Sequence, residues 1–193
     1  MTRLLSALAV CTALAPAVEA ADSADATTLA SLSGTFLSPK VEEWYGGFGT
    51  REFIFHDGQW QLIFTHALDQ GMTRRTFQFR TGGSYAILGP SAAVQGAFEA
   101  NFDEDWKHVT LLTTIPEVIA GMGMADCGLA FNLETDISAT GCGAWKPVAD
   151  CGIDHDLLAL DATGLRFGQR PADNDMCTPD RRPTALLGPV VPR

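Results

Sequence analysis

Apolar and polar residues alternate along much of the chain between residues 59 and 102. The period of two is clearest in segments 59–66, 75–80 and 96–102, where polar residues separate aromatic or aliphatic ones. Such alternation is typical of β-strands that bury one face. The large apolar members of these three faces are Trp60, Leu62, Phe64, Phe77, Phe79, Phe98 and Phe102.

Turn residues divide this part of the chain into short segments. Asp57-Gly58 separates a strand predicted at Thr50–His56 from one at Gln59–His66, and this pair favours the positive φ angles of a type I′ hairpin. Gly82-Gly83 is predicted to turn the chain into a separate strand at Ser84–Leu88.

The second half of the chain continues the β pattern with one helical interruption. Strands are predicted at 107–114, 133–138, 156–160 and 165–168. Pro116 suits the first turn of a short helix that extends to Met124. The sequence therefore predicts an all-β fold: a single antiparallel β-barrel-like domain, or strongly curved sheet, with one short helix.

The N-terminus has the features of an export signal. Arg3 precedes an alanine-rich apolar stretch, and small residues flank Glu19 at a cleavage site. We interpret residues 1–20 as a signal peptide, 21–32 as a flexible leader and 33–193 as the barrel domain. The protein is then exported, to the periplasm or out of the cell, and the mature chain has no transmembrane span. A lipoprotein acylated at Cys11 is the alternative.

The net charge restricts the possible binding partners, and the cysteine content indicates how the chain is cross-linked. The net charge is −10 and no basic run exceeds two residues, so nucleic acid is not expected as a partner. Removal of the signal leaves four cysteines, which in an exported chain indicate two disulfides with three possible pairings. A zinc site is the competing interpretation, although no Cys-x-x-Cys spacing occurs. The four cysteines are Cys127, Cys142, Cys151 and Cys177.

No catalytic, metal-binding or cofactor-binding motif emerges. The four histidines lack metal-ligand spacing, and no serine lies in a Gly-x-Ser-x-Gly elbow. Asp154-His155-Asp156 is interpreted as a solvated loop, and Asp173-Asn174-Asp175 as a polar turn rather than a calcium loop. We therefore expect no enzyme activity, no metal and no cofactor, and a hydrolase is the least favoured function.

Several motifs resemble the adenomatosis polyposis coli down-regulated domain family. They are Thr50–Asp57, Asp126–Gly128, Asp136–Cys142, Gly168–Pro171 and Pro179–Pro183, and they cover most of the predicted mature chain. The resemblance implies a β-barrel-like domain with a hydrophobic pocket for lipid, and it pairs Cys127 with Cys142, leaving Cys151 for Cys177. Wnt antagonism does not transfer, because animal members carry two copies and this chain has one. The motif residues interpreted as structural are Arg51, Gln169, Arg170, Pro171, Asp180 and Arg181.

Two functions follow from these observations. The first is a non-enzymatic barrel that binds an acyl chain or other apolar ligand against the seven apolar side chains named above. Gly96 and Ala100 are expected to leave space for that ligand, and the helix after Pro116 to cover one mouth of the barrel. The alternative is a protein-interaction or envelope-maintenance module with a fully packed barrel; the sequence identifies no particular protein partner.

Overall fold

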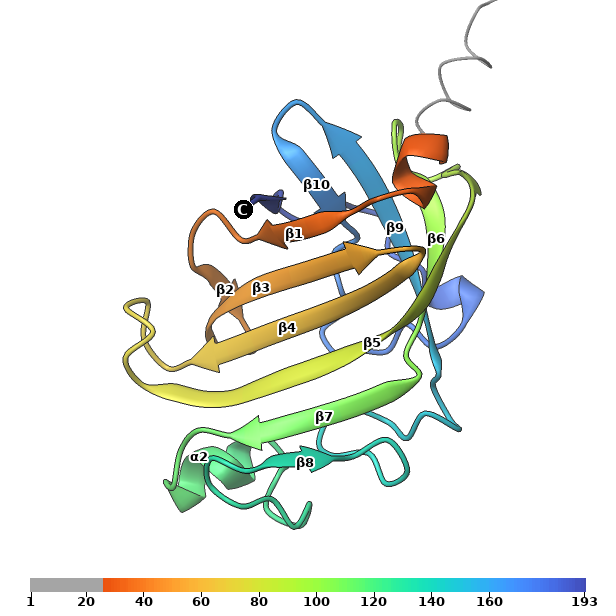
Figure 1. Cartoon of the computed structure of the whole chain (residues 1–193). Helices are drawn as coiled ribbons and strands as arrows, with labels where there is room; N and C mark the ends of the chain where they lie inside the picture. Colours follow the sequence, from red (N-terminus) through yellow and green to blue (C-terminus); the bar gives the residue numbers. More distant parts are fainter. Residues whose placement is uncertain (1–25) are drawn as a thin grey trace, which may run out of the picture.

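The computed structural model describes residues 26–193, and this part of the chain is built around one antiparallel sheet of eleven strands (Figure 1). The all-β, barrel-like fold predicted from the sequence is confirmed. The predicted signal peptide and the first residues of the predicted leader lie outside the described residues. Within the described residues, no helix has both the length and the apolar character needed to cross a bilayer.

Eight strands curve into a nearly closed barrel. The first and last strands of this path meet where Leu165 and Val190 exchange backbone hydrogen bonds of 2.9 and 2.8 Å. In spatial order the strands are β10 (Gly164–Phe167), β9 (Ile153–Asp161), β6 (Phe98–Asp103), β5 (Arg75–Pro90), β4 (Gln59–Ala67), β3 (Gly47–His56), β1 (Gly34–Leu37) and β11 (Val191–Pro192).

The remaining elements extend the sheet beyond the barrel. β2 (Glu42–Trp44) pairs with β3, whereas β7 (Trp106–Leu111) pairs with β5 and carries β8 (Glu134–Asp136) on its outer side. The helix α2 (Pro116–Gly121) lies beside β7 and β8, and the short helix η1 (Pro179–Arg181) precedes the C-terminal segment (Figure 1). β7 and β8 therefore form a branch that leaves the barrel at β5.

The hairpin predicted at Asp57-Gly58 is confirmed. β3 and β4 pair from His56↔Gln59 to Phe48↔Ala67, and the two turn residues have φ angles of 49° and 74°. Both angles fall in the left-handed region that a type I′ turn requires.

The strand break predicted at Gly82-Gly83 is wrong, because β5 runs through both glycines as one strand of 16 residues. Before the glycines β5 pairs with β7, and after them it pairs with β6. A Cβ on Gly82 would lie 2.6 Å from the Trp60 carbonyl oxygen, and one on Gly83 would overlap the carbonyl of Asp103. The glycines thus permit close backbone approach where the sheet branches.

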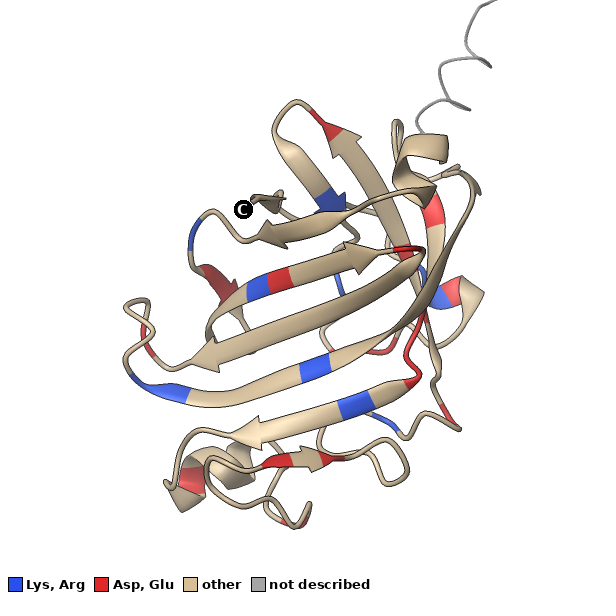
Figure 2. Cartoon of the chain, in the orientation of Figure 1, with Lys and Arg blue, Asp and Glu red and all other residues tan. Residues whose placement is uncertain are grey.

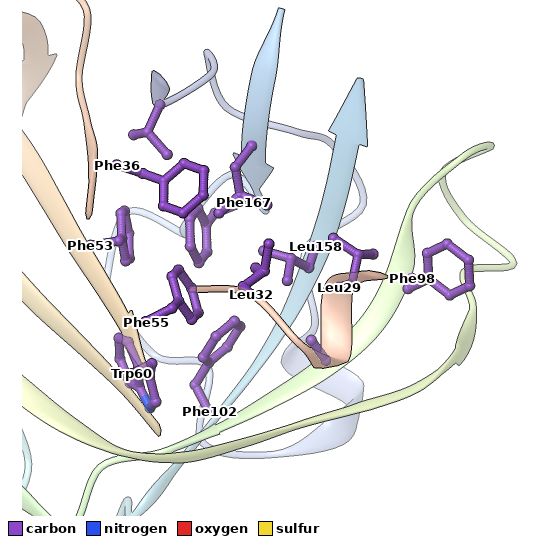
Figure 3. Close-up of a cluster of buried hydrophobic side chains, with 13 residues drawn as sticks. Leu29, Leu32, Phe36, Phe53, Phe55, Trp60, Phe98, Phe102, Leu158 and Phe167 are labelled. Atoms are coloured by element: carbon purple, nitrogen blue, oxygen red, sulfur yellow. The ribbon is translucent and has the colours of Figure 1, made fainter. Parts of the chain in front are cut away.

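Two large apolar clusters fill most of the fold, and a small third cluster contains Ala97, Leu157 and Ala159. The barrel core lies inside the eight-stranded path and contains the rings in Figure 3, and the branch core lies between β4, β5, β7 and the segments around α2. Buried members of the barrel core include Phe36, Phe53, Phe55, Trp60, Phe102, Leu158 and Phe167. Buried members of the branch core include Phe64, Phe77, Phe79, Val109, Leu111, Met124 and Ile137.

The structure corrects the predicted flexible leader for residues 26–32. Residues 26–30 are helical, and Leu29 and Leu32 are buried in the barrel core. The Tyr85 hydroxyl donates to the Leu29 carbonyl at 2.9 Å and accepts from the Leu32 amide at 3.1 Å. This segment is therefore packed, and the fold begins before Ser33.

Both disulfides have the pairing that the family resemblance implies. Cys127 bonds Cys142, which ties the segment after α2 to the loop after β8. Cys151 bonds Cys177, which ties the residues before β9 to the loop after β10. Disulfides of this kind are typical of proteins that fold in an oxidising compartment.

Candidate ligand-binding site

A cavity of about 50 Å³, partly open to solvent, lies where the barrel core meets the branch core. Leu62 packs against both clusters and lines the cavity between them. Five of the seven apolar residues singled out from the sequence line this cavity: Trp60, Leu62, Phe64, Phe79 and Phe102.

The other two predicted ligand residues lie outside the cavity. Phe77 is buried in the branch core, where its ring stacks on His66 with centroids 5.2 Å apart. Phe98 is buried at the edge of the barrel core, away from the central rings (Figure 3). Both side chains are packing residues in this structure.

The residues expected to leave space for a ligand, and the helix expected to cover one mouth of the barrel, do not lie at the cavity. Ala100 is fully buried in the barrel core, and Gly96 lies in the turn before β6, so neither borders the cavity. No residue of α2 lines it either; Ile119 of that helix packs against the branch core. The helix therefore covers the branch rather than the opening of the cavity.

Further aromatic side chains complete the cavity wall. Phe53 stacks on Phe167 at 3.8 Å, and Phe79 stacks on Trp145 at 4.5 Å. Phe53 has a sequence signal, because it shares the inward face of β3 with Phe55 at the period of two. Trp145 has none, since it belongs to a loop held by the Cys127–Cys142 disulfide. The added wall residues are Trp44, Tyr45, Phe53, Trp145 and Phe167.

The size of the cavity limits what it can hold. Its 50 Å³ is about a third of the roughly 150 Å³ of an engineered apolar cavity that admits benzene, and far below the ~300 Å³ of common drug-sized pockets. A complete acyl chain therefore does not fit between these rings as they stand. The volume suits a small apolar group or the end of a chain.

Part of the cavity wall is polar, and the interpretation of Asp154-His155-Asp156 as a solvated loop is wrong. Asp154 and Asp156 lie on β9 rather than in a solvated loop, and both are buried. They pair in register with Phe102 and Ala100 of β6, and Glu104 follows β6 directly. All three carboxyl groups line the cavity, and we call them the carboxyl cluster: Glu104, Asp154 and Asp156.

A buried ion pair holds Glu104. Its carboxylate lies 2.7 Å from Lys107 Nζ, which also donates to the carbonyls of Lys146 at 3.0 Å and Cys151 at 2.7 Å. The ammonium group thereby uses its three donors. Burial and the charge of Asp154 outweigh the attraction of Lys107 and raise the pKa of Glu104 to about 7.

Asp156 has no such ion pair. Its Oδ1 accepts from the amides of Leu157 at 2.6 Å and Gly168 at 2.9 Å, while no residue of the described chain hydrogen-bonds Oδ2. Burial raises the pKa of this carboxyl to about 7, against the attraction of Arg170. This hydrogen bond requires glycine at position 168, because a Cβ there would overlap Asp156 Oδ1.

Arg170 links the carboxyl cluster to Asn174, which also lines the cavity. Its Nη1 lies 2.7 Å from Asp154 Oδ2, and its Nε donates to Asn174 Oδ1 at 2.7 Å. The Tyr45 hydroxyl donates to the same oxygen at 2.8 Å. Although burial opposes its charge, Asp154 raises the pKa of Arg170 above its usual value. Arg170 therefore holds the loop after β10 against β9 and also lines the cavity.

Arg51 pairs across strands, as its interpretation as a structural residue implies. Its Nε and Nη2 donate to Glu42 of β2 at 2.8 and 2.6 Å, and Nη2 also reaches the Gly188 carbonyl at 2.9 Å. Its Nη1 is buried without a hydrogen-bond partner among residues 26–193, and the guanidinium lies 5.8 Å from the centre of the Trp44 ring. A cation–π contact of this kind stabilises the buried charge.

The other motif residues hold the C-terminal loops. The backbone amide of Gln169 donates to the Ala185 carbonyl, and the backbone amide of Asn174 donates to the Pro171 carbonyl. The Arg181 side chain forms an ion pair with Asp173. Asp180 is exposed within η1. Arg182 was not identified from the sequence, yet it donates to the Asp156 carbonyl and, at 2.7 Å, to that of Ala100. Its side chain thereby fixes the C-terminal loop against β6 and β9.

The described residues include no group of three or more His, Cys, Asp or Glu side chains placed to hold a metal ion. The carboxyl cluster forms an acidic part of the aromatic cavity wall. Figure 2 shows where acidic and basic residues lie along the strands and loops.

No protein-family model matches the sequence, and no curated protein matches it. The resemblance to the adenomatosis polyposis coli down-regulated domain family accordingly stays a prediction from the motif residues.

Proposed function

We propose that this chain is an exported, non-enzymatic β-barrel that binds a small apolar ligand, or the end of an acyl chain, in its interior cavity. One observation carries the proposal: the cavity lies between two separate aromatic clusters instead of being filled by either. Burial of a methylene group there contributes about 0.8 kcal/mol. The two disulfides support the exported location.

Titration with straight-chain alcohols from butanol to decanol, followed by tryptophan fluorescence, tests the proposal. Trp44, Trp60 and Trp145 line the cavity and report on its occupancy. We expect saturable binding that tightens roughly fourfold for each methylene. The affinity gain should stop once the chain outgrows the cavity.

A matched pair of variants locates the binding. Leu62→Phe adds a ring to the cavity wall, and Leu88→Phe makes the same change at an exposed position of β5. We expect Leu62→Phe to weaken alcohol binding at least tenfold and Leu88→Phe to leave it unchanged. Absence of binding, or equal binding by both variants, would refute the proposal.

A fully packed barrel that acts through its surface is the second candidate. The small volume of the cavity favours it, because modest movements of the surrounding rings would close a space of about 50 Å³. In that case every alcohol fails to bind, and Leu62→Phe stabilises the fold by filling the void.

A further inference from the structure

The charged side chains that line the cavity do not balance. Arg51 is neutralised by Glu42, Arg170 by Asp154, and Glu104 by Lys107, each through a contact of 2.6 to 2.7 Å. The Asp156 carboxylate is the charge that these three pairs leave uncompensated. Arg182 hydrogen-bonds its backbone carbonyl, and no Lys or Arg side chain of the described chain pairs with its carboxylate.

The surplus charge is enclosed, so solvent does little to screen it. The Asp156 residue is 4% exposed, and its Oδ2 has no hydrogen-bond partner among the described residues. An unpaired carboxylate in such a place is unfavourable unless it takes up a proton or a cation reaches it.

The rest of the wall suits a cation as well. Nine aromatic side chains line the cavity, and the faces of aromatic rings attract positive charge. The combination of ring faces with one uncompensated carboxylate is the chemistry that recognises organic ammonium groups.

We propose that the cavity selects a ligand whose apolar tail ends in an ammonium group, with Asp156 as the counter-charge. This inference rests on the proposed function, because it names the head group of the ligand that the same cavity would hold. An anionic head group is disfavoured, since it would add to the surplus negative charge. An uncharged head group could at most donate a hydrogen bond to Asp156 and would leave its charge uncompensated.

Calorimetric titration at pH 8 with n-pentylamine and 1-pentanol tests the proposal. The two probes have the same length, and only the protonated amine carries a charge. At this pH the amine is protonated and Asp156 is largely ionised. We expect the amine to bind the wild-type protein at least tenfold more tightly than the alcohol.

Two variants test whether Asp156 causes the preference for the amine over the alcohol. Asp156→Asn keeps the shape of the side chain and an oxygen for the amides of Leu157 and Gly168, but removes the charge. Asp161→Asn makes the same change at the exposed end of β9, outside the cavity. We expect the amine preference to disappear in Asp156→Asn and to persist in Asp161→Asn.

The outcomes separate this inference from the function on which it rests. Equal affinity for both probes, or an amine preference that survives Asp156→Asn, overturns the ammonium proposal and leaves the apolar cavity standing. Failure of both probes to bind overturns the two proposals together. Circular dichroism of Asp156→Asn shows whether the variant is folded.

Discussion

Asp156 shows why a buried carboxyl is hard to find in a sequence. Asp154-His155-Asp156 has the polarity of a solvated segment, yet β9 alternates so that both carboxyls face the interior. Arg51 had a clearer signal, because it shares the inward face of β3 with Phe53 at the period of two. Residue polarity alone misplaced the start of β9, because a buried polar residue is stabilised by partners distant in sequence.

The raised pKa of Asp156 makes stability depend on pH. The carboxyl titrates near pH 7 when folded and near 3.9 when unfolded, so between these values the folded state retains a proton that the unfolded state has lost. The free energy of unfolding contributed by Asp156 therefore falls as pH rises from about 4 to about 7, by at most about 1.4 kcal/mol per pH unit.

Urea unfolding of the wild type and Asp156→Asn at pH 5, 6, 7 and 8 measures this effect. Glu104, His66 and His155, whose pKa values are also shifted by burial, are present in both proteins, so their contributions largely cancel in the difference. We expect the stability advantage of the wild type over Asp156→Asn to shrink between pH 5 and 7 and to level off above. A difference that stays constant over this range would contradict the assignment.

At the scale of elements, the strands with regular alternation were predictable, and the path of β5 was not. The hairpin of β3 and β4 follows from local signals, namely a period of two and a turn pair. Gly82-Gly83 carries the same local signal as a turn, but its role depends on Trp60 and Asp103, which approach from other strands. Sequence patterns report local geometry and miss such tertiary contacts.

Alanine substitutions in β5 test the role of these glycines. Gly83→Ala places a methyl group against the Asp103 carbonyl, and we expect it to lower the free energy of unfolding by about 1–3 kcal/mol. Gly89→Ala is the control on the same strand, because nothing lies within 4 Å of the place its methyl group would occupy. Equal stability of the two variants in chemical denaturation would argue against close packing at the branch.

At the scale of the molecule, the disulfides tie long loops to the sheet. The bridges close separations of 15 and 26 residues. Chain entropy predicts about 3 kcal/mol of stabilisation for the shorter loop and about 3.5 kcal/mol for the longer. The Cys127–Cys142 bridge also holds the loop of Trp145, which stacks on Phe79 at the cavity.

Two double alanine variants, each lacking one disulfide, distinguish the roles of the two bridges. We expect each double variant to lose the stabilisation given above for its bridge. Only Cys127→Ala/Cys142→Ala should weaken alcohol binding more than its loss of stability explains, because it frees the loop of Trp145. Thermal unfolding and the fluorescence titration give both quantities. Equal loss of binding in the two double variants would show that the Trp145 loop has no special part in the site.

Ligand binding by this fold depends on an accessible space between the barrel core and the branch core. A crystal structure under xenon pressure tests this most directly, because xenon is small, apolar and visible by its scattering, and such atoms enter apolar cavities. We expect xenon in contact with Leu62 and Phe64 in the wild type and none there in Leu62→Phe. A wild-type crystal with no xenon between the barrel core and the branch core would contradict the existence of a ligand-binding cavity.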